Sequence, residues 1–537
     1  MKTKTQRQPG TRRRTGTESR SNAALPASSN LLWTVAAIAL VFAFSLQEVL
    51  ALSRLSATSD EPIHLASGYS YWRTRDFRLN PEHPPLAKLI AALPLLLLKP
   101  NIDTSSDNWK NAAQYELATS FLYGSGNDAD RLLFWGRLPI VVLAALGGLV
   151  AFLWARSLFG PRAGLFAVAL YSFCPNLLAH GMLVTTDVPL ATFILLTLYL
   201  FWRQGDRVTW RSSLVIGLAI GAAMASKFSG GLLPLLIAAF SGVRAFRQPD
   251  RRQALVTEVK SLTVMAAASL FVIEAAYLFS ASPLLYFRNL GLVYANHDPT
   301  YQYYLLGELK KGGWSYYFAV AFALKATVAT LVLISLAMVQ SISGLIERRG
   351  ETLLLAGAGI YFLVMSATAG NLGLRYVLPI FPLVYVWVSR IVPAYWASRL
   401  GRAALVTFVC WQMWAGVSTF PNYIPYFNEL AGGPSRGPDF LDDSNVDWGQ
   451  SVKQAATYAK ERGIQNIVMS PFSPLDNPAY YHMTANVLPP RELVLKSLPS
   501  GTYIISSHNI AWMKAVDPAW RRHEPVDRVG GLWVYRF

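Results

Sequence analysis

The sequence predicts a polytopic α-helical membrane protein with a small α/β domain at its C-terminal end. Hydrophobic residues make up 53% of the 537 residues, charged residues make up 15%, and the mean hydropathy is positive at +0.30. A soluble protein of this length needs more charge to cover its surface. The 16 Trp, 25 Tyr and 27 Phe residues are typical of aromatic belts at two membrane interfaces.

Eleven apolar stretches approach the length of about 20 residues that crosses a bilayer. They cover residues 31–52, 135–155, 163–181, 188–203, 212–226, 230–243, 261–281, 315–339, 352–368, 376–393 and 403–421. The fifth and sixth stretches are short, so these two could form one hairpin that does not fully cross. We expect residues 31–421 to form the transmembrane domain.

The distribution of basic residues predicts the orientation. Residues 1–30 carry seven basic residues, one acidic residue and few large apolar residues, so we expect a disordered cytoplasmic tail that sets topology, not a nucleic-acid-binding tail. With this end inside, alternate loops should be basic. Each loop predicted inside contains arginine: Arg156 and Arg162; Arg203, Arg207 and Arg211; Arg244 to Arg252; Arg348 and Arg349; Arg399 and Arg402. The predicted location is therefore a plasma membrane, the inner membrane if the source is bacterial.

Polar residues concentrate on the opposite, extracytoplasmic side. All seven histidines lie in or beside the segments predicted outside, which include the first loop, 53–134, and the C-terminal domain, 422–537. In that domain, residues 467–469 and 501–506 read as strands and 451–462 as a helix. Cys174 and Cys410 lie in apolar stretches as small packing residues. No His-x-x-x-His motif or Cys cluster offers a metal site. Asp60, Glu61 and Asp187 could together hold a divalent cation, but we expect no metal or other cofactor.

The first outside loop holds the strongest candidates for chemistry. Adjacent carboxylates, Asp60 and Glu61, follow the end of the first apolar stretch, where they are costly unless they are paired or functional. One of them could serve as a general base. Alternatively, Asp60 caps a helix that begins at Pro62. His83-Pro84-Pro85 can likewise fix the turn before a helix over residues 86–98, whose Lys88 reaches lipid headgroups.

These motifs resemble the protein O-mannosyltransferase family. The resemblance begins with Asp60-Glu61-Pro62-Ile63-His64 and His83-Pro84-Pro85-Leu86-Ala87-Lys88. It continues in weaker elements: Thr185-Thr186-Asp187-Val188-Pro189, Ser226-Lys227-Phe228-Ser229-Gly230, Trp314 to Phe318 with Lys325, Leu374-Arg375-Tyr376-Val377-Leu378-Pro379, Tyr426 to Pro434, and Asp443 to Gln450. The family belongs to the membrane glycosyltransferases of the C-type fold. The match extends over residues 31 to 450.

The resemblance implies a function. Members transfer a sugar, here mannose or a related hexose, from a polyprenyl-phosphate donor to an acceptor hydroxyl on the extracytoplasmic face, and they invert the anomeric centre. Asp60 matches the general base, and Glu61 would bind the acceptor or steady Asp60. His64, His83 and Asp187 would line the sugar and acceptor pocket. Cations would stabilise the departing phosphate; the candidates are Lys227, Arg375, Lys88, Lys325 and Arg137. Lys227 and Arg375 are favoured, because both lie in tight outside turns next to apolar stretches.

Several alternatives stay open at the level of sequence. The outside cations could anchor headgroups, and Asp187 could simply cap the helix that follows it. A transporter or flippase of lipid-linked sugars would share the spans and the cations, but it would favour repeats and polar residues at the midplane. A membrane scaffold would not need the Asp60–Glu61 pair. The acceptor can be a protein, a lipid or a glycan, and Glu48 and Glu274 have no assigned role.

Overall fold

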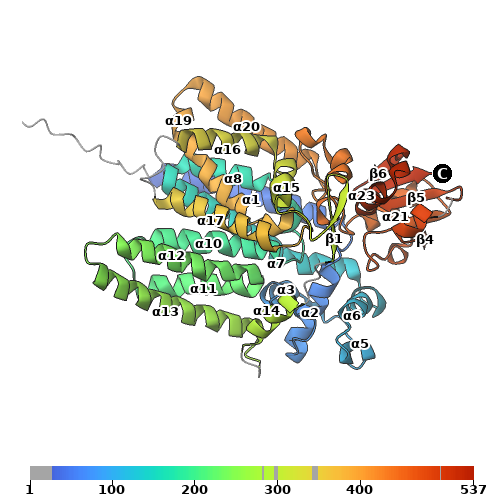
Figure 1. Ribbon diagram of the computed structural model, residues 1–537, viewed down its shortest axis with the longest axis horizontal. Helices are drawn as coiled ribbons and strands as arrows, with labels where there is room; N and C mark the ends of the chain where they lie inside the picture. The colour runs from blue at the N-terminus through green and yellow to red at the C-terminus, as the bar shows by residue number, and fades with distance from the viewer. Residues whose placement is uncertain (1–26, 281–283, 296–299, 342–348, 496–497) are drawn as a thin grey trace, which may run out of the picture.

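The computed structural model describes residues 27–280, 284–295, 300–341, 349–495 and 498–537. Nearly all of the predicted basic tail, and Arg348 of one predicted inside loop, lie outside the described residues. The helices form one bundle, and a domain built on a sheet lies at one end of it (Figure 1).

The bundle contains long helices and bent or broken ones. Its members are α1 (Ala27–Leu52), α7 (Ala129–Phe159), α8 (Pro161–Ser172), α9 (Pro175–Gly181), α10 (Asp187–Gln204), α11 (Trp210–Ser226), α12 (Leu232–Phe246), α13 (Arg251–Ala276), α15 (Tyr317–Lys325), α16 (Val328–Ser341), α17 (Arg349–Thr368), α18 (Ile380–Val388), α19 (Val392–Trp396) and α20 (Arg399–Ser418).

Apolar length marks several of these helices as membrane-spanning. In the described part of the chain, 5 helices are long and apolar enough to cross a bilayer, or up to 7 if each bent pair counts as one span. The bent pairs are α8 with α9, at 64°, and α15 with α16, at 111°. The bundle is therefore that of a polytopic helical membrane protein. Each of the predicted stretches overlaps a helix or a broken pair.

One boundary differs clearly from the prediction. Helix α13 begins at Arg251, ten positions before the expected start at residue 261. The Asp250 side chain accepts a hydrogen bond from the Gln253 backbone and caps this end. Buried Glu258 forms an ion pair with Arg244 of α12, at 2.5 Å, so the polar turns of α13 pack against the preceding helix. Apolar length alone cannot locate a helix end that is stabilised by a cap and an ion pair.

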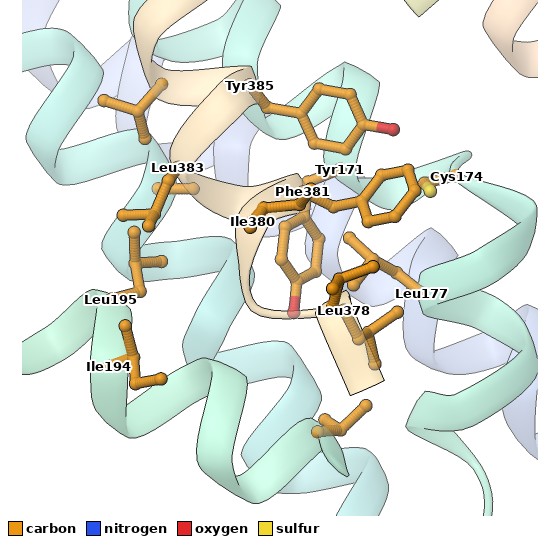
Figure 2. Close-up of a cluster of buried hydrophobic side chains, with 14 of the residues drawn as sticks. Tyr171, Cys174, Leu177, Ile194, Leu195, Leu378, Ile380, Phe381, Leu383 and Tyr385 are labelled. Carbon is orange, nitrogen blue, oxygen red and sulfur yellow. The ribbon is translucent and has the colours of Figure 1, made fainter. Parts of the chain in front are cut away.

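Aromatic and aliphatic side chains fill the space where α8, α9, α10 and α18 meet (Figure 2). Tyr171 and Cys174 contribute from the first bend, Leu195 from α10, and Phe381 and Tyr385 from α18. Cys174 is buried and forms no disulfide, as expected of a packing residue, whereas Cys410 is exposed. This core fixes the start of α10 and the turn before α18, and both segments carry candidate site residues.

The first outside loop folds into short helices, in the order α2 (Glu61–Thr74), α3 (Leu86–Ala92), α4 (Leu95–Leu98), α5 (Asp107–Lys110) and α6 (Gln114–Thr119). The expected helix over residues 86–98 breaks at Leu93-Pro94, because proline lacks the amide hydrogen that a continuous helix needs. Helices α2 and α3 touch at Gly68, where an added Cβ would lie 2.1 Å from the Lys88 carbonyl oxygen. A glycine therefore sets the spacing of the two helices.

Two smaller elements lie on the same side as this loop. Helix α14 (Leu285–Ala295) precedes an antiparallel hairpin of β1 (Gln302–Leu305) and β2 (Glu308–Lys311).

The C-terminal domain has a mixed sheet in the order β4-β3-β5-β7-β6. Its elements are α21 (Val452–Glu461), β3 (Ile467–Ser470), β4 (Ala485–Val487), α22 (Pro490–Leu495), β5 (Thr502–Ser506), α23 (Ser507–Val516), β6 (Asp527–Val529) and β7 (Leu532–Arg536).

We predict that Gly68→Ala destabilises the protein. The new methyl group would meet the backbone of α3, which cannot move aside as a flexible side chain can, and overpacking of this kind costs about 1–3 kcal/mol. Gly242→Ala in α12 is the matched control, because nothing lies within 4 Å of the position of its added Cβ. Apparent thermal midpoints of the purified proteins in detergent check this, and equal midpoints would contradict the close packing of α2 against α3.

Candidate active site

A buried ion pair organises the candidate site. The Glu61 carboxylate accepts two hydrogen bonds from the Arg137 guanidinium, at 2.8 and 2.6 Å, and neither side chain is exposed. Glu61 also accepts the backbone amides of Thr58 and Val184, both at 2.9 Å. Both carboxylate oxygens are therefore occupied, which favours a positioning role for Glu61 over contact with an acceptor.

The Arg137 guanidinium donates all of its hydrogen bonds to groups of the protein itself. Its remaining donors go to the carbonyls of Leu52, Leu55 and Ser56, at the end of α1. The pair therefore ties α1, α7, the first loop and the segment before α10 together. Its donors are satisfied by the chain itself, so the prediction that Arg137 binds phosphate has no support in this arrangement.

Asp60 precedes α2 and points into the site. It occupies the capping position, but its side chain makes no capping hydrogen bond, so the alternative role as a helix cap finds no support. Its Oδ2 instead lies 3.3 Å from a guanidinium nitrogen of Arg375, and the carboxylate is 27% exposed. Asp60 is thus held as an ion pair and remains accessible, as a general base must be.

A second carboxylate and two cations complete the arrangement. Asp187, at the start of α10, lies 2.5 Å from the Lys227 ammonium and 3.8 Å from Arg375. Arg375 therefore stands between Asp60 and Asp187. Its Nε is buried and has no hydrogen-bond partner among the described residues. An unpaired buried donor is costly unless a ligand accepts from it, and a phosphate oxygen is a suitable acceptor.

Two aromatic residues that sequence reasoning did not assign complete the cation site. The Arg375 guanidinium lies 4.2 Å from the Trp448 ring centroid, and the Lys227 ammonium lies 4.4 Å from that of Tyr376. Such contacts stabilise a cation while leaving its other face free. Both aromatic residues belong to motifs that the resemblance had drawn attention to, and only the tertiary contacts give them this role.

The C-terminal run Asp443 to Gln450 fastens this arrangement. Asn445 accepts the Leu374 amide at 3.0 Å, and the Ser444 hydroxyl donates to the Leu372 carbonyl at 2.6 Å. The Trp448 carbonyl accepts the Ser59 amide at 2.9 Å, next to Asp60. Residues far apart in the chain therefore hold both Arg375 and Asp60. This acidic stretch is therefore largely structural.

Two of the predicted phosphate ligands have their donors engaged by the protein. The Lys88 ammonium donates to Tyr71, to Asn80 and to the His83 carbonyl, at 2.8 to 3.1 Å. Burial lowers the pKa of Lys88 to about 7. The Lys325 ammonium donates to the carbonyls of Ile424 and Asn445. Lys227 and Arg375 are therefore the cations best placed for a substrate phosphate.

His64 and His83 stand beside Asp60. The His64 Nδ1 lies 2.7 Å from the Val184 carbonyl, and the two imidazole rings are 5.4 Å apart. Burial holds the pKa of both histidines below the usual range. For His83, the neighbouring His64 and the positive charges of Lys227 and Lys88 lower the pKa further. Asp60, His64 and His83 each offer a ligand atom within 4.8 Å of the others, so this group could hold a metal ion.

We predict strong coupling between Glu61 and Arg137. Either Glu61→Gln or Arg137→Gln leaves a buried charge without its partner, which costs about 3–5 kcal/mol. The double variant should lose much less than the sum, because no charge is then left unpaired. Apparent thermal midpoints of the four proteins test this. Additive losses would contradict the pairing.

Asp447 makes stability depend on pH. It is fully buried beside the Ser506 hydroxyl, and burial raises its pKa to about 6. The unfolded chain loses this proton near pH 4, at about the reference value of 3.9. The folded state then binds more protons between pH 4 and 6, so this contribution to stability is present below pH 4 and is lost as the pH rises to about 6.

We therefore expect the apparent thermal midpoint of Asp447→Asn to increase relative to that of the wild type as the pH rises from 4 to 6. Thermal unfolding at steps of half a pH unit measures the difference. Glu461→Gln, at an exposed position of α21, is the control and should follow the wild type. A constant difference between Asp447→Asn and the wild type would contradict the assignment.

The comparisons with known proteins agree with this picture. The family described as dolichyl-phosphate-mannose-protein mannosyltransferase matches residues 130–277, which include Arg137, Asp187 and Lys227. A search of the curated proteins found no match. The matched residues cover the part of the bundle from α7 to α13.

Solved structures resemble nearly the whole chain. ArnT from Cupriavidus metallidurans in the apo state has a TM-score of 0.50 at 12% identity, covering 94% of this chain and 98% of that chain. Archaeal oligosaccharyltransferase AglB from Archaeoglobus fulgidus, in complex with an inhibitory peptide and a dolichol-phosphate, has a TM-score of 0.48 at 12% identity, covering 93% and 74%. At these identities the likeness concerns the fold. The chain therefore has the fold of ArnT, and the family model matches residues 130–277 within that fold.

Proposed function

We propose that this protein transfers mannose or a related hexose from a polyprenyl phosphate to an acceptor hydroxyl on the extracytoplasmic face of a plasma membrane. The observation that carries the proposal is the partly exposed Asp60 carboxylate held by Arg375 beside the Lys227–Asp187 pair. One group can accept a proton there, and two cations can receive a phosphate. The family match over residues 130–277 supports mannose as the sugar.

The reaction we infer is a direct displacement. The acceptor oxygen forms a bond to the anomeric carbon from one side, and the bond from that carbon to the phosphate oxygen breaks on the other, which inverts the centre. The hydroxyl proton passes to Asp60, and the electron pair of the broken bond goes to the phosphate. The Arg375 guanidinium, 3.3 Å from the Asp60 carboxylate, holds that side chain in the site.

The leaving phosphate gains negative charge as the bond breaks. Arg375 and Lys227 can stabilise that charge, and the buried, unpartnered Nε of Arg375 offers a donor that is not used within the described chain. The rings of Trp448 and Tyr376 support the two cations from behind. We propose no metal cofactor for this step, because the cations already supply the positive charge.

The membrane arrangement we propose has eleven crossings, with the N-terminus in the cytoplasm and residues 422–537 outside, in the bacterial inner membrane if the source is bacterial. Helices α7, α10, α12 and α20 carry basic residues near the ends that lie away from the site. These residues support the proposed orientation. The acceptor would be a protein, a lipid or a glycan, and it would approach from the side of the C-terminal domain.

Asp60→Asn should abolish most transfer. Purified protein in lipid would receive radiolabelled polyprenyl-phosphate mannose, or polyprenyl-phosphate glucose, together with a membrane extract as the source of acceptor. We expect a loss of about a hundredfold or more, the size of a missing general base. The labelled product identifies the acceptor class.

Asp76→Asn is the matched control, because Asp76 lies in the same loop, is also 27% exposed and also pairs with an arginine, Arg78. Equal transfer by the wild type, Asp60→Asn and Asp76→Asn would exclude Asp60 as the base. If the wild type transferred from neither donor but moved labelled lipid across a vesicle bilayer, the protein would be a transporter instead.

A further inference from the structure

The group formed by Asp60, His64 and His83 has a feature that sugar transfer does not require. One carboxylate oxygen and one nitrogen from each imidazole lie within 4.8 Å of one another. His64 comes one helical turn after Asp60, so the start of α2 presents both side chains on the same face. His83 reaches the same point from the turn before α3.

The hydrogen bond of His64 orients the ring for ligation. Its Nδ1 faces the Val184 carbonyl at 2.7 Å, and a carbonyl can only accept, so Nδ1 carries the proton of the neutral ring. The lone pair is then on Nε2, on the far side of the ring. Histidines that ligate metals are held in this way, with the second nitrogen bonded to a backbone carbonyl or a carboxylate.

His83 is fixed by its backbone and leaves its ring nitrogens available. Pro84 and Pro85 follow it, and the Lys88 ammonium holds its carbonyl at 2.8 Å. Its ring meets that of His64 edge to face, and we find no hydrogen bond to either of its nitrogens within the described part of the chain. A half-buried polar ring without a partner is a ready ligand.

The local charge tolerates a cation. The positive charges of Arg375 and Lys227 are matched by Asp60 and Asp187, while the Lys88 ammonium is directed to Tyr71, Asn80 and the His83 carbonyl. Two imidazole nitrogens and one carboxylate suit zinc and similar transition metals, whereas magnesium and calcium prefer oxygen ligands. Three protein ligands would leave a coordination position open.

We propose that Asp60, His64 and His83 bind one divalent transition metal ion of the zinc class. Under the proposed function, the ion occupies the carboxylate that serves as the base, so it inhibits transfer and is not a cofactor. That consequence rests on the proposed function, whereas the binding itself does not.

The test is zinc titration of the full-length protein, purified in detergent and freed of metal with a chelator, followed by calorimetry. We expect one zinc ion per chain, and binding at least tenfold weaker in His64→Gln and in His83→Gln. His482→Gln, at an exposed position of the C-terminal domain, is the control and should bind as the wild type does. Cobalt(II) added to the unmodified protein should give the visible absorption of a site with nitrogen ligands, a readout that needs no variant.

Two results would overturn the proposal: no saturable zinc binding by the wild type, or binding by both histidine variants that is as tight as that of the wild type. The assay with Asp60→Asn separates this inference from the proposed function. Transfer that depends on Asp60 in a protein that binds no zinc would leave the function standing and the metal site rejected. Zinc binding in a protein whose Asp60→Asn variant still transfers sugar would leave the metal site standing and reject Asp60 as the base.

Discussion

The buried pair of Glu61 and Arg137 is the interaction on which the rest of the site depends. Two charges taken out of water are stable only when their hydrogen bonds are complete, and here the pair makes contacts with the end of α1, with Thr58 and with Val184. The carbonyl of Val184 in turn orients His64, and the chain reaches Asp187 three residues later. Asp60 and Asp187 therefore come from segments that the same carboxylate holds in place.

The C-terminal segment acts as the second constraint. Residues Asp443 to Gln450 lie between the sheet domain and the bundle, and they hold the turn that bears Arg375 as well as the backbone beside Asp60. The face of Trp448 supports Arg375 directly. The C-terminal domain is thus joined to the chemistry through its connection to the bundle, and the state of buried Asp447 can influence how firmly that connection is held.

Sequence patterns predicted much of the bundle and the more local part of the site. Apolar length located each predicted span near a helix, and the adjacent carboxylates in the first loop directed attention to Asp60. The end of α13 escaped prediction, because a cap and the Arg244–Glu258 pair extend that helix through polar residues. Sequence favoured Lys227 and Arg375 among the five candidate cations, but only the tertiary contacts showed that the donors of Lys88, Lys325 and Arg137 are engaged within the protein.

What the sequence determined by itself is the membrane character, the side on which polar chemistry gathers and the presence of a carboxylate pair, because these follow from composition and local order. What only the tertiary structure decided is the partner of each charge. Glu61 is buried and pairs with Arg137, whereas its neighbour Asp60 is accessible. The Lys88 ammonium donates to carbonyls of its own loop. Such pairings join residues from 5 to 315 positions apart, and the energy of a charge depends on what surrounds it in space.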